Sequence, residues 1–146
     1  MKVKILPSKT SGEVSAPPSK SFAHRYLIGS VLSRGKCVIK NIADSDDISA
    51  TLSCIEQLGG SVTKDGNTVT VIPTNEKQIE NTVFDCKESG STLRFFIPVV
   101  LATGAKNCTF SGSERLLARG IKEYEKLFEN SDVKIKSDEK SIEVNG

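Results

Sequence analysis

Hydrophobic positions along the chain form short β-branched runs and longer segments with helical spacing, and this order occurs twice. In the first copy, a strand at 13–15 is expected to lead into a helix over 21–33 and a strand at 37–42. An amphipathic helix over 44–58 and a β-hairpin over 61–72 complete the copy. The pattern therefore predicts one β-α-β-α-β-β unit.

The second copy repeats this order about 70 residues later, as the 70 positions between Ser21 and Ser91 illustrate. Its expected elements are a strand at 82–86, a helix over 91–102, a strand at 107–112, one amphipathic helix over 113–130 and a hairpin over 132–146. A unit with one apolar face cannot bury that face alone, so the two units are expected to pack on each other. This predicts a mixed α/β (α+β) fold.

The first helix of each unit is apolar on nearly all sides, which predicts two central helices covered by the other helices and the hairpins. The unit boundaries follow from the repeat. Residues 1–14 precede the units, residues 15–80 form the first unit, and residues 81–146 form the second.

Composition excludes several classes of protein. Twenty Lys and Arg against eighteen Asp and Glu leave a formal charge of +2, spread along the chain, so no nucleic-acid partner is expected. The first ten residues are too polar for a signal peptide, and the apolar runs are too short to cross a bilayer. The four cysteines lack a C-x-x-C pair and adjoin apolar stretches, which predicts reduced thiols, no metal site and a cytoplasmic protein without a membrane partner.

The start of the first long helix carries candidate anion-binding residues. A helix start exposes unpaired backbone N–H groups and about half a positive charge. Lys20 and Arg25 add cations there, and Ser21 adds a hydroxyl donor one turn above Arg25. The alternative is that Ser19 or Ser21 only caps the helix and that Lys20 is only solvated.

The corresponding helix of the second unit begins in a similar way. Gly90 lets an anion approach the backbone closely, and Ser91 adds a hydroxyl. Arg94 is the only charged residue between Glu88 and Lys106, in a segment too apolar to meet water. Its guanidinium must therefore reach the helix start, a carboxylate or a ligand. Two such helix starts would suit a substrate that carries both phosphate and carboxylate.

Other polar residues have plainer explanations. Asp46 lies in an acidic helix start that suits the helix dipole without any ligand. His24 is the only histidine and has no partner at a readable spacing, so a packing or polar contact is expected. Arg115 and Arg119 lie one turn apart near a predicted helix start, where the dipole disfavours cations. An anion is therefore expected near Arg115, with solvation as the alternative.

Four segments resemble the first third of the 5-enolpyruvylshikimate-3-phosphate synthase (3-phosphoshikimate 1-carboxyvinyltransferase) family: PPSKSFAHR, NIADSDDISATL, CKESGSTLRF and SGSERLLARG. The resemblance spans nearly all of the chain. It implies a two-lobed fold, each lobe built from three β-α-β-α-β-β units with helix starts facing a cleft. It also implies transfer of the enolpyruvyl group of phosphoenolpyruvate to the 5-hydroxyl of shikimate 3-phosphate, a step of aromatic amino acid biosynthesis, with no metal or organic cofactor.

The resemblance assigns ligand roles by position. Lys20 matches a lysine that touches both substrates, and Ser21 and Arg25 match residues that bind shikimate 3-phosphate. Gly90 and Arg115 match a glycine and an arginine that contact phosphoenolpyruvate.

Three further residues are secondary candidates. Arg94 matches an arginine near the phosphoenolpyruvate site. Ser91 ends the segment Glu88–Ser91, where some members of the family carry Asn-Ala-Gly-Thr. Asp46 lies in the matched acidic segment, from which the resemblance allows a link to the opposite lobe. No catalytic acid or base of the family is matched.

The resemblance leaves the third unit of one lobe and most of the other lobe unmatched. The chain is therefore expected to be a fragment that binds anions weakly and does not turn over alone, with residues 1–14 starting in the other lobe. Uncovered strand edges and helix faces predict self-association. The alternatives are a relative that acts on UDP-N-acetylglucosamine and a non-catalytic anion-binding or assembly module; Lys20-Ser21 with Arg25 favours the shikimate substrate.

Overall fold

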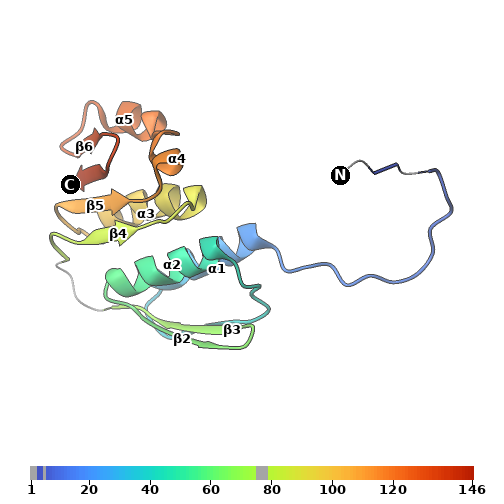
Figure 1. Ribbon diagram of the computed structural model, residues 1–146. Helices are drawn as coiled ribbons and strands as arrows, with labels where there is room; N and C mark the ends of the chain where they lie inside the picture. The colour runs from blue at the N-terminus through green and yellow to red at the C-terminus, as the bar shows by residue number, and fades with distance from the viewer. Residues whose placement is uncertain (1–2, 5, 75–78) are drawn as a thin grey trace.

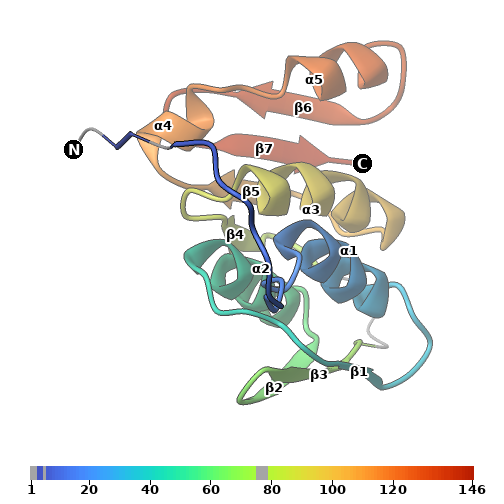
Figure 2. The same ribbon diagram turned by 90° about the vertical axis from the view of Figure 1, so that its right-hand side faces the viewer.

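The computed structural model describes residues 3–4, 6–74 and 79–146. Helices α1, α2 and α3 pack against one another; α1 and α2 cover a three-stranded sheet, and α3 covers one face of a four-stranded sheet (Figures 1 and 2). This mixed α/β arrangement confirms the predicted fold class. Among the described residues, no helix has the length and apolar character needed to cross a membrane.

The first unit consists of α1 (Lys20–Val31), β1 (Cys37–Ile39), α2 (Asp46–Gln57), β2 (Ser61–Asp65) and β3 (Thr68–Ile72). Its sheet has the order β1-β3-β2, and both pairings are antiparallel. The predicted hairpin is present. Asp65 faces Thr68 across a two-residue turn in which Gly66 has a φ of +54°, a conformation that favours glycine.

The second unit consists of β4 (Val83–Asp85), α3 (Gly90–Ala102), β5 (Cys108–Ser111), α4 (Glu114–Leu117), α5 (Lys122–Phe128), β6 (Lys134–Ser137) and β7 (Ile142–Asn145). Its sheet has the order β4-β5-β7-β6. β4 and β5 are parallel, and the other pairings are antiparallel. The strand predicted at the start of this unit is present as β4, and the hairpin predicted at its end is present as β6 and β7.

The prediction of a strand at 13–15 is wrong for this structure. These residues are in no strand, the side chain of Val14 is 96% exposed, and the chain before α1 runs away from the rest of the molecule (Figure 1). Strand structure needs a partner strand, and none lies beside this segment in the described structure. The first sheet therefore has three strands, with an open edge at β1.

The prediction of a single helix over 113–130 is also wrong. Gly120 adopts a φ of +64° and separates α4 from α5. This left-handed conformation ends the first helical segment, as glycine commonly does. Leu117 and Ile121 of the predicted apolar stripe are still buried, while Tyr124 is only half-buried.

The two long helices differ in burial, contrary to the prediction that both are central. α3 buries Leu93, Phe96 and Ile97, as predicted. In α1, however, the side chains of Phe22 and Tyr26 remain 61% and 60% exposed. No described element covers that face of α1.

The division into 1–14, 15–80 and 81–146 remains a prediction. The structure supports the 70-residue period, because Ser19 and Ser89, which are 70 positions apart, are the N-caps of α1 and α3. The boundary near 80 follows residues 75–78, which lie outside the described residues, as do Met1, Lys2 and Ile5 of the first segment.

A chain of buried polar side chains joins α1, α2 and α3. The distance from His24 Nδ1 to Thr51 Oγ1 is 2.8 Å, that from Thr51 Oγ1 to Thr92 Oγ1 is 2.7 Å, and that from Thr92 Oγ1 to Ser89 Oγ is 2.7 Å. Thr92 donates to Ser89, while the donors in the other two contacts depend on the His24 tautomer and on the orientation of the hydroxyl groups. The predicted polar contact of His24 is therefore confirmed.

Burial of the His24 imidazole disfavours its charged form. Its Nε2 atom is buried and has no hydrogen-bond partner among the described residues. Burial lowers the pKa of His24, with smaller lowering effects from Lys20 and Arg25 that oppose the raising effect of Asp47. The charged imidazole would also carry a proton on Nε2, and no described residue is placed to accept a hydrogen bond from that atom.

An aromatic cluster forms the core of the second unit. The ring centroids of Phe84 and Phe110 lie 5.1 Å apart, and those of Phe84 and Phe96 lie 6.1 Å apart. Buried cysteine thiols extend the core on both sides of the unit boundary. The hydrogen bond between Cys86 and Cys54, together with burial, raises the pKa of the Cys86 thiol. The side chains of Cys54, Cys86 and Cys108 are buried, whereas that of Cys37 is only partly buried.

Replacing Phe84 with alanine is expected to lower the free energy of unfolding by about 3–5 kcal/mol, because it leaves a cavity between two packed rings. Urea unfolding followed by circular dichroism measures this change. The control is Leu127→Ala, whose side chain is 69% exposed and whose effect is expected to stay within about 0.5 kcal/mol. Equal losses in the two variants would contradict this core.

Stability is expected to fall as the pH drops below the ordinary His24 pKa of 6.5. The unfolded chain takes up a proton on His24 in that range, whereas the folded chain, with its lowered pKa, resists protonation until a lower pH. His24→Asn keeps a donor for Thr51 but does not titrate. Urea unfolding at pH 7.5, 6.5 and 5.5 should therefore show a smaller loss for the variant, and parallel losses would contradict the buried neutral imidazole.

Candidate anion-binding site

The starts of α1, α2 and α3 lie on the same side of the molecule. His24, Thr51 and Thr92 all belong to the first two turns of their helices, and the buried hydrogen bonds hold these turns within contact distance. The Thr51 hydroxyl also lies 3.1 Å from the carbonyl oxygen of Asp47, in the first turn of α2. The positive ends of three helix dipoles therefore converge, as the sequence predicted for two of them.

Side-chain caps satisfy part of each helix start. The hydroxyls of Ser19, Ser45 and Ser89 accept hydrogen bonds from the backbone N–H groups of Phe22, Ile48 and Thr92, respectively. The capping role therefore belongs to Ser19 rather than to Ser21, which leaves the exposed Ser21 side chain outside the cap.

Lys20 connects the first turn of α1 with the first turn of α2. Its Nζ atom lies 2.5 Å from Oδ2 of Asp47, and the two side chains are 56% and 30% exposed. An ion pair this exposed contributes little to stability, because water and salt screen it. Lys20 can exchange this carboxylate for another anion at small cost.

Arg25 extends from α1 towards α3. Its Nη1 atom donates to the carbonyl oxygen of Ser21 at 2.9 Å, and its guanidinium carbon lies 5.4 Å from the centroid of the Phe95 ring. A guanidinium above an aromatic face is held by a cation–π interaction. Arg25 therefore places a cation between the two helices that carry the predicted site.

Gly90, the first residue of α3, lies against two arginines. A Cβ atom at this position would lie 2.9 Å from Nη1 of Arg94 and 3.5 Å from Nη1 of Arg119. Arg94 thus reaches back to the start of its own helix, which is one of the three destinations that the sequence allowed. The hydroxyl of Tyr124 donates to the carbonyl oxygen of Arg94 at 2.8 Å and ties α5 to this turn.

Glu88 forms ion pairs with two arginines, Arg115 and Arg119. Its Oε1 atom lies 3.3 Å from Nη1 of Arg115 and 3.8 Å from Nη2 of Arg119. The anion expected near Arg115 is therefore a carboxylate of the chain itself. In contrast, Arg25 and Arg94 have no carboxylate within ion-pair distance in the part of the chain that the structure describes.

Asp46 and Ser91 are exposed residues at two of the helix starts. Asp46 is the first residue of α2, next to the Ser45 cap, and suits the dipole of its helix as the plainer explanation expected. Ser91 is the second residue of α3 and follows the glycine that the arginines approach. The structure gives neither side chain a contact that favours a ligand role.

Sequence reasoning did not select Arg119 and Glu88 as site residues. The one-turn spacing of Arg115 and Arg119 was a usable signal for the former. Glu88 offered no signal, because its contacts depend on the turn that separates β4 from α3. Asp47 was considered only as part of a helix cap, although it holds Lys20.

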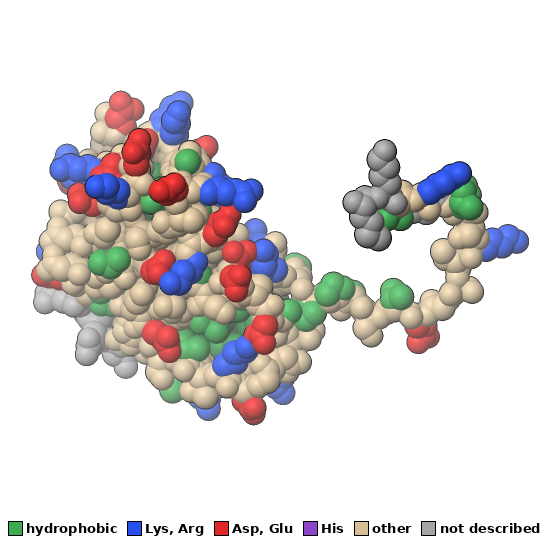
Figure 3. All heavy atoms as spheres, in the orientation of Figure 1, with side chains coloured by type: hydrophobic (Ala, Val, Ile, Leu, Met, Phe, Trp, Pro, Cys, Tyr) green, Lys and Arg blue, Asp and Glu red, His purple; other side chains and the backbone are tan. Residues whose placement is uncertain are grey.

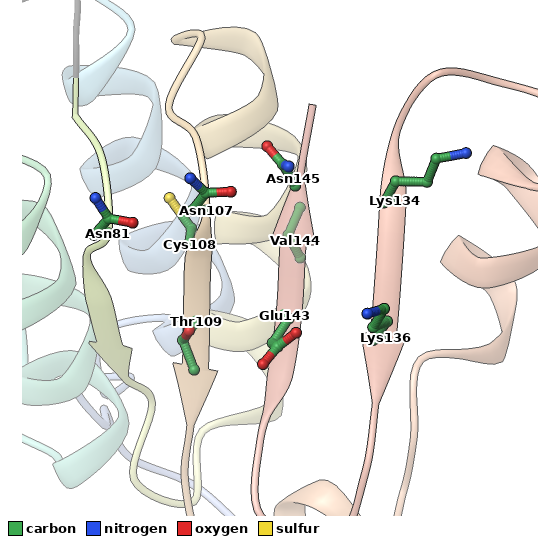
Figure 4. Close-up of a pocket in the computed structure, with 9 residues that line it drawn as sticks. All are labelled: Asn81, Asn107, Cys108, Thr109, Lys134, Lys136, Glu143, Val144 and Asn145. Carbon is green, nitrogen blue, oxygen red and sulfur yellow. The ribbon is translucent and has the colours of Figure 1, made fainter.

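The surroundings of the site are open. A shallow hollow of about 510 Å³ lies beside it, lined by residues that include Lys87, Glu88 and Ser113. Another hollow, of about 500 Å³, lies on the face of the four-stranded sheet that is turned away from the helices and contains none of the predicted site residues (Figure 4). On the face shown in Figure 3, acidic and basic side chains are interspersed, so the charge of the site is local.

The described residues contain no group of three histidine, cysteine or acidic side chains placed to hold a metal ion. What the site offers is hydrogen-bond donors and positive charge. Three helix starts, Lys20, Arg25 and three further arginines surround a region that two carboxylates partly neutralise. Such an arrangement can bind and orient a multiply charged anion.

This chain is similar to known proteins over most of its length. The profile of the family described as EPSP synthase (3-phosphoshikimate 1-carboxyvinyltransferase) matches residues 6–145. The 3-phosphoshikimate 1-carboxyvinyltransferase of Clostridium novyi (strain NT) is 40% identical over 144 residues, which cover 92% of this chain and 33% of that protein. The protein of the same name from Clostridium botulinum (strain Eklund 17B / Type B) is 42% identical over 142 residues, which cover 90% and 31%.

Solved structures show the same fold. A structure of EPSP synthase from Acinetobacter baumannii superposes with a TM-score of 0.76 at 17% identity and covers 92% of this chain and 32% of that one. The chain thus spans about one third of the length of these relatives. Since the family profile extends over nearly all of its residues, the chain belongs to the EPSP synthase family.

Proposed function

We propose that this chain supplies one wall of the substrate site of a 3-phosphoshikimate 1-carboxyvinyltransferase. In this reaction the 5-hydroxyl oxygen of shikimate 3-phosphate bonds to the enolpyruvyl carbon of phosphoenolpyruvate, and the bond from that carbon to the phosphate oxygen breaks, releasing phosphate. The observation that carries the proposal is the convergence of three helix starts upon Lys20, Arg25 and Arg94.

The substrate roles divide between the two units. Lys20, Ser21 and Arg25 bind shikimate 3-phosphate, whose phosphate and ring hydroxyls suit a helix start with a lysine and an arginine. Lys20 also contacts phosphoenolpyruvate, which Gly90 and Arg115 hold through its phosphate and carboxylate. Binding releases Lys20 from Asp47 and Arg115 from Glu88, both exposed pairs that exchange readily.

The secondary residues act around these contacts. Arg94 adds positive charge beside Gly90, and Ser91 adds a hydroxyl at the same helix start. Asp46 faces outward from the start of α2, where a second lobe would contribute its link.

The chemistry of this wall is positioning and charge stabilisation. The chain has one histidine, and it is buried, neutral and engaged with Thr51. General acid–base catalysis needs a group within reach of the substrate that can exchange a proton, and the nearby carboxylates of Asp47 and Glu88 are paired with Lys20 and Arg115. The chain alone is therefore expected to bind both substrates weakly without turning them over, in the cytoplasm and with no cofactor.

A non-catalytic anion-binding module is the second candidate. It is favoured by the open surroundings of the site. A relative acting on UDP-N-acetylglucosamine is less well supported, because Lys20, Ser21 and Arg25 together suit a compact phosphorylated substrate.

Lys20→Ala is expected to weaken binding of shikimate 3-phosphate at least about tenfold, because a charge-assisted hydrogen bond contributes about 1.5–3 kcal/mol. Isothermal titration calorimetry on the full chain measures this loss. The matched control is Lys36→Ala, which removes an exposed lysine of the same unit outside the site. Equal affinities for all three chains would contradict the site, and preferential binding of UDP-N-acetylglucosamine would favour the rival substrate.

Gly90→Ala is expected to weaken binding of phosphoenolpyruvate at least about fivefold, equivalent to about 1 kcal/mol. The added methyl group would lie 2.9 Å from the Arg94 guanidinium and displace it, while the flexible arginine lets the fold survive. Gly29→Ala is the control, since nothing lies within 4 Å of its new methyl group. Loss of affinity in both variants, or in neither, would contradict the role of Gly90.

A further inference from the structure

Pro98 leaves one backbone carbonyl of α3 without its helical hydrogen-bond donor. It lies inside this helix, which continues to Ala102. In an α-helix, each N–H donates to the carbonyl oxygen four residues earlier, which for position 98 is that of Arg94. Proline has no N–H, and its ring crowds the same carbonyl. The carbonyl oxygen of Arg94 is therefore open to a donor from outside α3.

The hydroxyl of Tyr124 supplies this donor. It donates to the carbonyl oxygen of Arg94 at 2.8 Å, across 30 positions of the chain. The helix that carries it, α5, has no fully buried residue, and the half-buried ring of Tyr124 packs against the core. In the described part of the chain, this hydrogen bond is the polar contact that joins α5 to α3.

Both ends of this hydrogen bond lead to an arginine beside Gly90. A Cβ atom at Gly90 would lie 2.9 Å from Nη1 of Arg94, which supplies the accepting carbonyl, and 3.5 Å from Nη1 of Arg119. Arg119 precedes Tyr124 by five positions. Between them, Gly120 has a φ of +64°, a conformation in which the chain changes direction. The attachment of α5 therefore fixes the chain on the far side of this turn.

The equivalent position of the first unit does not need such a donor. Ile28 lies 70 positions before Pro98, inside α1. It has an N–H that can donate to the carbonyl oxygen of His24 within the helix. The contact thus belongs to the unit whose helix start carries the candidate phosphoenolpyruvate residues, and its loss should spare the shikimate 3-phosphate residues of α1.

We propose that Tyr124 is a positioning residue for phosphoenolpyruvate, whose hydroxyl takes the place of the N–H that Pro98 lacks. The hydrogen bond holds the first turns of α3 against α5, so that Arg94 and Arg119 keep their places beside Gly90. This inference rests on the proposed function, because it assigns these places to the binding of that substrate. Tyr124 acts through the two arginines and does not itself touch the ligand.

Calorimetry on the full chain tests this role with Tyr124→Phe, which keeps the ring and removes the hydroxyl. The affinity for phosphoenolpyruvate is expected to fall at least about fivefold, because the arginines lose their fixed places. The affinity for shikimate 3-phosphate is expected to stay within about twofold. The control is Tyr26→Phe, which removes the hydroxyl of the chain's other tyrosine, 60% exposed, and is expected to change neither affinity.

Pro98→Ala provides a rescue, because alanine returns an N–H to the Arg94 carbonyl from within the helix. Pro98 is exposed, so this change opens no cavity. In the Pro98→Ala chain, Tyr124→Phe is expected to weaken phosphoenolpyruvate binding less than about twofold. The midpoint of thermal unfolding, followed by circular dichroism, should fall by about 2–4 °C on Tyr124→Phe alone and by less in the Pro98→Ala chain.

The outcomes separate this role from the proposed function. Equal phosphoenolpyruvate affinities with and without the Tyr124 hydroxyl, or a loss that Pro98→Ala does not reduce, would overturn the positioning role alone. Equal falls of the thermal midpoint in both backgrounds would overturn the replacement of the Pro98 N–H, whether or not a ligand binds. An unaltered chain that binds no phosphoenolpyruvate would contradict the proposed function and the positioning role together.

Discussion

A short chain of buried hydrogen bonds determines where the charged side chains of this protein lie. His24, Thr51 and Thr92 come from three different helices, and their contacts fix the first turns of those helices against one another. Because these turns carry Lys20, Arg25 and the start of α3 at Gly90, the positions of these groups follow from buried contacts between the helices. A buried polar network of this kind is costly when it is incomplete, so it specifies one packing of the helices.

The two units share one order of elements but differ in their sheets. Both have a capping serine, a long helix, a strand and a hairpin in the same order. They differ at the turn before the helix, where Lys87 adopts a left-handed conformation that Pro17 cannot adopt. The second unit pairs β4 with β5, whereas the first leaves the edge of β1 open in the described structure, beside a groove and the exposed rings of Phe22 and Tyr26.

The sequence was sufficient for features that depend on local chemistry. The hairpins, the 70-residue period, the central α3 and the candidate cations at the helix starts follow from turn residues, apolar spacing and isolated charges. It was insufficient for features that depend on contacts between residues far apart in the chain. Thr51 lies 27 positions from His24 and 41 from Thr92, so their contacts leave no periodic signal. The prediction of a strand at 13–15 was wrong because strand propensity does not show whether a partner strand is present. The prediction of one helix over 113–130 was wrong because Gly120 adopts a left-handed conformation within it.

Buried contacts hold the helices of the site, here called the scaffold, whereas the ion pairs of the site lie at the surface. The scaffold is buried, while Lys20 and Arg115 sit on it as exposed side chains with exposed carboxylates for partners. Exposed pairs are weak, so Asp47 and Glu88 hold the cations in place without preventing exchange with a stronger anion. Phosphate gains more from the same groups, because it carries more charge and also accepts from the backbone N–H groups of the helix starts. A rigid core with weakly engaged cations is therefore suited to anion binding, and catalysis would require acid and base groups supplied by other residues.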